Sequence, residues 1–288
     1  HTPKVFRHLE ENEVLCSDAE AFRNEAHRRR ELILNNDGTV DSGDRLRVIG
    51  HDDLLEEDRY ADLPEDCKSR PGELVTLVNG EDISGHFEAF IHAPFKDDQA
   101  KERNNTSLSL NVSLLDGDKR AQFFLFGDRE YATIKRIFEV TEEHEENLQY
   151  LKWNVMLSAH HCSKSVMFWK DDGDDEPKFR QDIMDYFEKY SQDGKIIASS
   201  MSDFSDKEGK NPPHKKARTK YEAIVDAGNF LCTHEYPDKE NPKPIVFTLN
   251  DSNGFNFEDV RGKSQGAAAF AAAVEPARGA NKPPKTQT

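Results

Sequence analysis

Between His86 and Leu249 the sequence alternates short strand-like runs with helical patterns, and this alternation constrains the fold more than any other feature. Residues 107–114 alternate polar with apolar, residues 116–119 form a hairpin turn, and residues 121–126 form the return strand. Further strands are expected at 155–159, 195–201, 230–235 and 244–249, separated by helices at about 131–138, 179–190 and 215–227, the last ended by Gly228. This order predicts an α/β fold whose strand ends meet at one edge of a sheet.

The remainder of the chain predicts one domain over residues 1–260 and a tail over residues 261–288. Ser17–Asn35 has the pattern of a helix with Ser17 as its N-cap, and short strands are expected at 45–49 and 74–78. The tail is rich in Ala, Gly and Pro and carries five basic residues and one acidic residue. We expect the tail to be a flexible basic linker.

The composition limits the class of protein. The chain has a net charge of -16, so that residues 1–260 carry about -20, which disfavours a generic binder of nucleic acid or anionic lipid. No stretch approaches the roughly 20 apolar residues of a membrane span. The four cysteines lack CxxC spacing and no signal peptide is evident, so we expect free thiols and a cytoplasmic location.

One carboxylate follows a strand directly. Asp128 comes after Phe-Phe-Leu-Phe and a glycine, a position suited to a metal ligand at the edge of a sheet. The alternative is that Asp128 caps the helix that follows it. His86 and His92 lie on one strand, and we interpret them as ordinary structural histidines.

Two later loops also carry reactive side chains. His160 and His161 follow an apolar strand, and because adjacent residues cannot share a face, we expect one of them to point into a site. Ser163 could orient a ligand or bind an oxyanion. His214 follows two prolines in a basic loop and could stabilise a phosphate, although a solvated basic turn is an equal alternative.

The order of these motifs resembles the C-terminal half of the metallo-β-lactamase fold, in the ComEC/Rec2-like branch of metallohydrolases. That branch has an Asn-x-x-Ser strand, then Gly-Asp, His-His-Gly-Ser and Asn-x-x-Gly-His-Pro. The corresponding segments here are Asn104-Asn105-Thr106-Ser107, Gly127-Asp128, His160-His161-Cys162-Ser163 and Asn211-Pro212-Pro213-His214. The resemblance spans about Phe87 to Leu249 and implies an αββα sandwich.

The resemblance also implies roles for the motif residues. Asp128 would bridge divalent metals, zinc or manganese, and His160 would be the imidazole ligand, with His161 as the alternate. Ser163 and His214 would line the substrate side near the scissile phosphate. A metal-activated water would then hydrolyse a phosphodiester or related ester bond.

Two departures from the family pattern matter. Cys162 stands in place of the glycine of His-His-Gly-Ser, and the principal His-x-His-x-Asp-His motif is absent from the sequence. Because the N-terminal strands are also missing and no initiator Met precedes His1, we expect the domain to be incomplete at its N-terminus. Asp128 and His160 alone would give about half of a binuclear centre.

Three functions follow as hypotheses. The first is a metal-dependent hydrolase of phosphodiesterase or nuclease type. The second is a degenerate member of the fold that acts as a binding or regulatory module, contacting a protein partner through its acidic surface or its tail. The third is a nucleic-acid-binding protein that uses the basic loop around His214 together with the tail.

Overall fold

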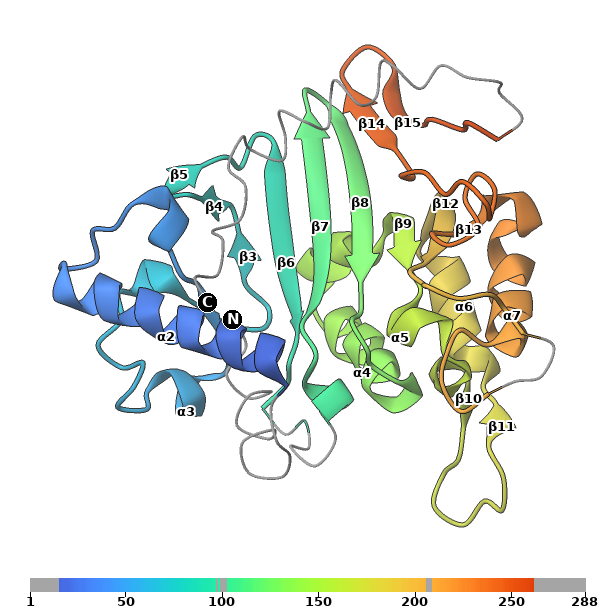
Figure 1. The fold of residues 1–288 in the computed structure, drawn as a ribbon, viewed down its shortest axis with the longest axis horizontal. Helices are drawn as coiled ribbons and strands as arrows, with labels where there is room; N and C mark the ends of the chain where they lie inside the picture. Colours follow the sequence, from blue (N-terminus) through green and yellow to red (C-terminus); the bar gives the residue numbers. More distant parts are fainter. Residues whose placement is uncertain (1–15, 97, 99–102, 206–208, 262–288) are drawn as a thin grey trace.

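A mixed seven-stranded sheet organises the molecule (Figure 1). The computed structural model describes residues 16–96, 98, 103–205 and 209–261. The strands follow the order β13-β12-β9-β8-β7-β6-β3, where β8, β9, β12 and β13 are parallel and β3, β6, β7 and β8 are antiparallel. Their bounds are β3 Leu74–Val75, β6 Phe87–Ala93, β7 Ser109–Asp116, β8 Lys119–Leu125, β9 Trp153–Leu157, β12 Ser191–Ala198 and β13 Phe230–Cys232. The α/β class predicted from the sequence is thereby confirmed.

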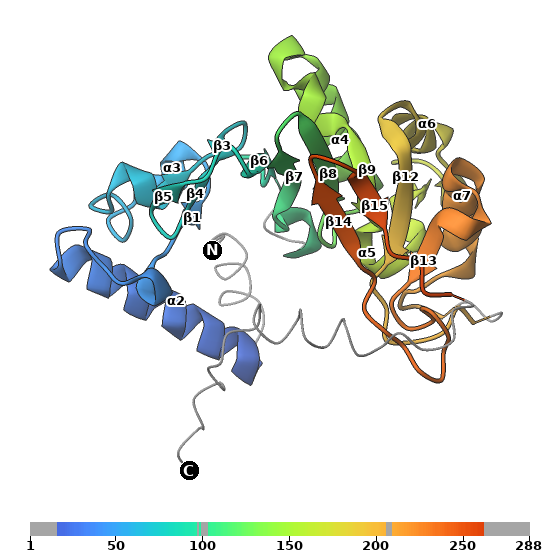
Figure 2. The ribbon, with the colours of Figure 1, turned by 90° about the horizontal axis from the view of Figure 1, so that it is seen from above.

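Three helices cover one face of this sheet (Figure 2). They are α4 (Tyr131–Glu142), α6 (Gln181–Lys189) and α7 (Lys215–Val225), and each connects two adjacent parallel strands. Because these crossovers all progress in one direction across the sheet and share one hand, the helices lie on the same side. The main hydrophobic core fills the space between helices and sheet, with Phe126, Phe138 and Phe187 fully buried in it.

The burial of β7 is the reverse of what an alternating strand usually shows. Ser109, Asn111 and Ser113 face the helical layer and are fully buried, whereas the leucines and the valine between them are half-buried or exposed on the other side. The buried polar groups have partners: the Ser109 hydroxyl donates to the Phe126 carbonyl at 2.9 Å, and the Asn111 amide donates to the Lys152 carbonyl at 2.8 Å. The period of two predicted from the sequence is therefore present, with its faces exchanged.

A hairpin packs on the apolar outer face of the sheet (Figure 2). It consists of β14 (Phe247–Asn250) and β15 (Gly254–Phe257), which pair antiparallel. The ring of Phe123 on β8 meets Phe247 and Phe255 edge-on. The sequence indicated the first of these two strands and missed the second.

The N-terminal elements surround a second, smaller hydrophobic cluster. The helix α2 spans Ser17–Asn35 as predicted, but its N-cap is Cys16 instead of Ser17. The cluster consists of Ile33, Val48, Leu54, Leu55, Tyr60 and Leu63. A cavity of about 370 Å³ separates this cluster from the outward face of β6, with Ile33 on one wall and Ile91 on the other.

The remaining short elements complete the described chain. Besides β14 with β15, the described residues form three further two-stranded pairings outside the main sheet: β1 with β2, β4 with β5, and β10 with β11. The strand bounds are β1 Val48–Ile49, β2 Lys68–Ser69, β4 Leu77–Val78, β5 Glu81–Asp82, β10 Phe168–Trp169 and β11 Lys178–Phe179. The helical turns are η1 Ser42–Asp44, α3 Asp52–Leu55, η2 Glu65–Cys67, η3 Arg103–Thr106, η4 Glu145–Leu151, α5 Ala159–Cys162, η5 Lys164–Val166 and η6 Ala227–Asn229.

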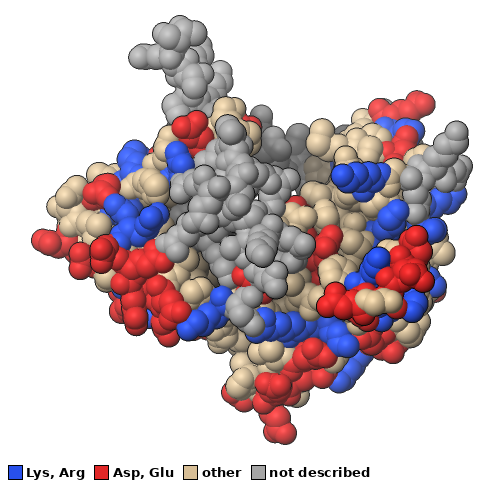
Figure 3. Space-filling view, turned by 90° about the horizontal axis from the view of Figure 1, so that it is seen from below, with Lys and Arg blue, Asp and Glu red and all other residues tan. Residues whose placement is uncertain are grey.

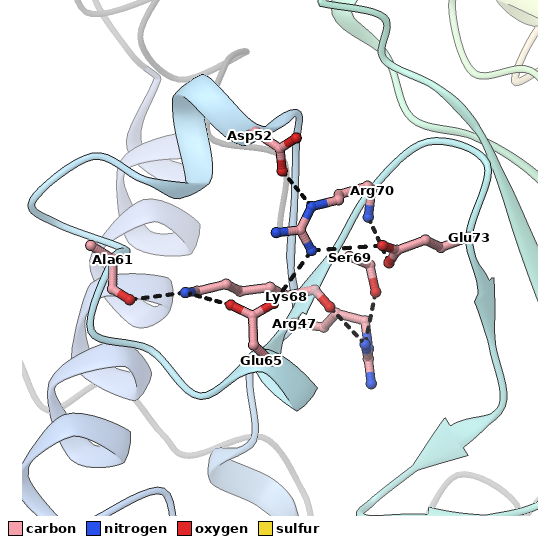
Figure 4. A network of polar contacts seen from close by, with 8 residues as sticks. All are labelled: Arg47, Asp52, Ala61, Glu65, Lys68, Ser69, Arg70 and Glu73. Atoms are coloured by element: carbon pink, nitrogen blue, oxygen red, sulfur yellow. Dashed lines mark hydrogen bonds and ion pairs between the residues drawn. The ribbon is translucent and has the colours of Figure 1, made fainter.

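Polar contacts fasten the N-terminal loops to β2 (Figure 4). The side chain of Lys68 is buried, and its ammonium group donates to the Ala61 carbonyl at 2.9 Å and to the Glu65 carboxylate at 3.0 Å. Next to it, Arg70 reaches the Asp52 carboxylate at 2.5 Å. These bonds satisfy the buried ammonium group and hold α3 against the strand pair.

Two further findings concern the ends of elements. The helix α7 ends at Val225, where Asp226 takes a φ of 61°, so the prediction that Gly228 ends this helix is wrong. Of the tail predicted over residues 261–288, residues 262–288 lie outside the described residues, and so do residues 206–208 of the loop before His214. Within residues 16–96, 98, 103–205 and 209–261, no helix is both long enough and apolar enough to cross a membrane.

Candidate functional site

The carboxyl ends of the four parallel strands open on one edge of the sheet, toward the bottom of Figure 1. Side chains that can carry chemistry follow three of these strands: Asp128 after β8, His160 and His161 after β9, and Thr233 after β13. Ligands of open α/β sheets bind at such edges. Figure 3 views the molecule from this side, with Asp and Glu gathered along its lower left edge, toward α2 and α3, next to patches of Lys and Arg, and with charges of both signs at its right. We call this edge the rim.

The loop after β9 is a turn of three consecutive left-handed residues. His160 has φ 49° and ψ 48°, His161 has φ 54° and ψ 37°, and Cys162 has φ 65°. A non-glycine residue in this region costs about 1–2 kcal/mol, so the turn persists only because its surroundings hold it. The His160 amide donates to the Gly127 carbonyl at 2.9 Å, and the Cys162 carbonyl accepts from the His214 amide at 3.1 Å. Backbone strain of this kind is concentrated at functional sites.

The turn directs His161 toward Asp128. The Nε2 atom of His161 lies 3.4 Å from Oδ1 of Asp128, and its Nδ1 lies 2.9 Å from the Ser199 carbonyl oxygen. A carbonyl only accepts, so Nδ1 carries a proton, and in the neutral ring the lone pair of Nε2 faces the carboxylate. A lone pair and a carboxylate attract each other only when a proton or another cation lies between them. The two side chains therefore attract each other either through a proton on Nε2 or as one edge of a cation site.

The spacing of this pair suits a metal ion. A tetrahedral zinc with ligand bonds of about 2.0–2.1 Å separates neighbouring donor atoms by about 3.4 Å, the separation between Asp128 and His161. A histidine that ligates through Nε2 also commonly donates Nδ1–H to a backbone carbonyl. Catalytic zinc takes three protein ligands, however, and the described residues contain no group of three or more His, Cys, Asp or Glu side chains able to hold a metal. They supply two ligands and not a complete centre.

His160 points away from this pair. Its Nδ1 lies 3.7 Å from the Glu130 carboxylate, and this buried nitrogen makes no hydrogen bond to the residues that the structure describes. The structure thus brings Asp128 together with His161, which the resemblance gave as the alternate ligand, while His160 faces Glu130. The two imidazoles diverge because the left-handed turn rotates successive side chains to different sides.

Ser163 and His214 lie behind the rim. Both are almost fully buried. The Ser163 hydroxyl accepts from the Ser165 amide at 3.3 Å and caps η5. The imidazole of His214 uses both nitrogens on the backbone: Nδ1 accepts from the Lys164 amide at 3.2 Å, and Nε2 donates to the Gly209 carbonyl at 3.2 Å. In this arrangement both side chains hold the loops together, and their roles in catalysis stay predictions.

The turn that presents Asp128 has its own support. Gly127 has φ 65°, and a Cβ atom there would lie 2.8 Å from Cβ of Ser107, so the close approach requires glycine. The Ser107 carbonyl accepts from Nε of the fully buried Arg129, whose Nη2 donates to Asp98 at 2.8 Å. Sequence reasoning missed Arg129, because an arginine beside a strand end gives no sign that it will be buried.

The alternative reading of Asp128 as a helix cap is wrong, since the N-cap of α4 is Glu130. The neighbouring thiol is also unsuited to nucleophilic chemistry. Cys162 is fully buried, and this burial raises the pKa of its thiol well above the usual range. It therefore stays protonated and packs in the main core.

In comparisons with known proteins, no family model, no curated protein and no solved structure matches this chain at a significant level. The chemistry of the rim must therefore be argued from its own residues.

Proposed function

We propose that the chain forms part of a metal-dependent hydrolase of the metallo-β-lactamase fold, ComEC/Rec2-like and of phosphodiesterase or nuclease type. The observation that carries this proposal is the pair of Asp128 and His161, whose donor atoms lie 3.4 Å apart at the carboxyl edge of the parallel strands. The order of the four motifs along the chain supports it. So does the arrangement of a mixed sheet with helices on one face, which is compatible with half of an αββα sandwich.

In this proposal Asp128 and His161 hold one edge of a divalent metal site, for zinc or manganese. The remaining ligands come from parts of the protein other than the described residues. When bound, such a metal supplies a Lewis acid and an activated water. This chain fixes the tautomer of His161 through the Ser199 carbonyl and keeps the Asp128 turn in place through Gly127. We further propose a phosphodiester or nucleic-acid-type substrate and, since all four cysteines are described and free, a cytoplasmic location.

The test is metal-dependent hydrolysis of a phosphodiester such as bis(p-nitrophenyl) phosphate. Asp128→Ala removes one of the two ligands. Because loss of a mere outer-shell partner of a metal ligand already costs about 10–100-fold, we expect at least a hundredfold loss of the metal-dependent rate. Asp118→Ala is the matched control, because Asp118 is an exposed carboxylate in the turn at the other end of β8. Full activity in Asp128→Ala, with activity equally unaffected in Asp118→Ala, would contradict the proposal.

A second candidate is a binding or regulatory module that keeps the fold without the metal. Two observations favour it: the described residues supply only two ligands, and both ring nitrogens of His214 are already bonded to the backbone. Elemental analysis of the purified protein distinguishes the candidates. Stoichiometric zinc or manganese counts against the binding module, whereas a metal-free protein that hydrolyses no phosphodiester with added metal supports it. In that case we propose the acidic surface near α3 or the basic tail as the contact with a protein partner.

A further inference from the structure

The loop after β13 is bonded to the loop after β12 through one hydroxyl group. Oγ1 of Thr233 accepts from the Ser200 amide at 3.0 Å and donates to the Ser200 carbonyl at 2.9 Å. The Thr233 amide donates to the Ala198 carbonyl, also at 3.0 Å. Thr233 is therefore hydrogen-bonded to Ala198 and to Ser200, the residues on either side of Ser199, but not to the Ser199 carbonyl.

The Ser199 carbonyl and the Ser200 amide belong to the same peptide group. This peptide is trans, so its C=O and N–H point in opposite directions. On one side the N–H is held by the Thr233 hydroxyl, and on the other the C=O accepts from Nδ1 of His161 at 2.9 Å. A single peptide thus links the end of β13 to the imidazole that faces Asp128.

His161 has two ways to place one proton on a neutral ring. With the proton on Nδ1 it donates to the Ser199 carbonyl, and with the proton on Nε2 it could donate to Asp128, whose Oδ1 lies 3.4 Å away. Only the first form leaves Nε2 free to act as a ligand. A hydrogen bond to the N–H of a peptide polarises its C=O and strengthens the bond that the C=O accepts.

We propose that Thr233 is a positioning residue for His161: by holding the 199–200 peptide, its hydroxyl keeps the imidazole proton on Nδ1 and the Nε2 lone pair toward Asp128. The use of that lone pair for a metal rests on the proposed function. The choice of tautomer does not, because it is a property of the protein without metal.

The experiment compares Thr233→Val with Thr233→Ser in the full chain. Valine keeps the shape of the side chain and removes the hydroxyl, whereas serine keeps the hydroxyl. Because Thr233 is exposed, neither change removes core packing. The readout is the ¹⁵N NMR spectrum of the His161 ring in metal-free protein at alkaline pH. The spectrum reports which nitrogen carries the proton.

We expect Nδ1–H in the native protein and in Thr233→Ser, and a shift of about two- to tenfold toward Nε2–H in Thr233→Val, the effect of losing one net hydrogen bond. The same tautomer ratio in all three proteins, or an equal shift in both variants, would overturn the proposal.

A titration with Zn²⁺ then separates this proposal from the proposed function. If the rim binds metal, Thr233→Val weakens Zn²⁺ binding by up to about tenfold, while Thr233→Ser binds as the native protein does. If the tautomer shifts but no protein binds Zn²⁺, the proposed function fails and the positioning role of Thr233 stands.

Discussion

At the scale of single residues, the turn 160–162 shows how a site can be built from backbone conformation. Its three φ angles of 49°, 54° and 65° are those that glycine adopts readily, yet the residues are His, His and Cys. The fully buried side chain of Cys162 anchors the end of the turn in the main core. The free energy of packing Cys162 therefore offsets the strain that places the Nε2 atom of His161 opposite Asp128.

This strain predicts an unusual order of stability between two variants at position 162. Both Cys162→Gly and Cys162→Ala remove the buried sulfur, but only glycine relieves the left-handed conformation. We expect the glycine variant to be the more stable of the two by about 1 kcal/mol, the reverse of their order in a helix interior. Urea unfolding monitored by circular dichroism measures the difference. An alanine variant as stable as the glycine variant, or more so, would show that the turn carries no such strain.

The residue scale is also where sequence reasoning reached its limit. The Gly-Asp after an apolar strand indicated Asp128, and the His-His pair indicated an imidazole near it. Which imidazole faces Asp128 depends on the sign of φ at His160 and His161. No glycine in the turn signals a positive φ, so the residue types alone could not decide between them. The role of Thr233 was equally hidden, because it acts through a peptide bond and not through a side chain.

At the scale of elements, His92 joins β6 to the helical layer. Its Nδ1 accepts from the Thr141 hydroxyl of α4 at 3.2 Å, and its Nε2 donates to the Tyr150 carbonyl of η4 at 3.1 Å. The ring packs between Phe90 and Phe124. Burial lowers the pKa of His92 from 6.5 to about 4, so the imidazole is neutral in the folded protein at neutral pH.

This lowered pKa predicts how stability depends on pH. Between pH 6.5 and 4 the imidazole of His92 is protonated in the unfolded chain but not in the folded protein. The contribution of His92 to the unfolding free energy is therefore intact above pH 6.5 and is lost as the pH falls to 4. The loss amounts to about 3 kcal/mol of unfolding free energy. In His92→Gln this part of the dependence of unfolding free energy on pH should vanish, whereas the variant His144→Gln, which changes an exposed histidine, should keep it. Denaturant unfolding at several pH values measures the slopes, and equal slopes in His92→Gln and the native protein would contradict the assignment.

Elements were predicted better than their faces and ends. The periods of β7, α2 and α4 come from local spacing, which the sequence displays directly. The sequence does not show which face of β7 is buried. Either face of an alternating strand can be buried if its polar groups find partners, as Ser109 and Asn111 do. Likewise both Asp226 and Gly228 could end α7, and the choice of Asp226 at φ 61° depends on tertiary packing.

At the scale of the whole molecule, two hydrophobic clusters of unequal size lie on opposite sides of the sheet, and a cavity lies between the smaller cluster and β6. The main cluster contains most of the buried side chains, while the N-terminal cluster has only six. A cavity of about 370 Å³ between the small cluster and β6 means that few contacts couple the two. Regions with few buried apolar contacts open at lower free energy than the main core. We therefore expect the N-terminal cluster to open while the sheet stays folded.

Hydrogen exchange followed by mass spectrometry tests this expectation. Leu55→Ala removes a fully buried side chain of the small cluster, a change that costs about 2–5 kcal/mol. Exchange should accelerate in α2 and in residues 48–69, with little change in β8, β9 and β12. The matched variant Ile137→Ala, which truncates a buried side chain of α4, should accelerate exchange in those strands. Acceleration of the same size throughout the chain in Leu55→Ala would mean that the two clusters unfold as one unit.

The buried polar row of β7 has a consequence for how the strands find their partners. Leu110 pairs with Leu125, and Asn111 with Phe124. A slip of one residue would turn the amides and hydroxyls of β7 outward and press its leucines against the positions where Phe126 and Lys152 offer carbonyl acceptors, leaving those acceptors buried without donors. A strand that is apolar on both faces can tolerate a slipped pairing, because one leucine can take the place of another in the core. The buried polar residues of β7 do not tolerate a slipped pairing, so they select a single alignment of β7 with β8. That alignment also fixes where the end of β8 places Asp128 at the rim.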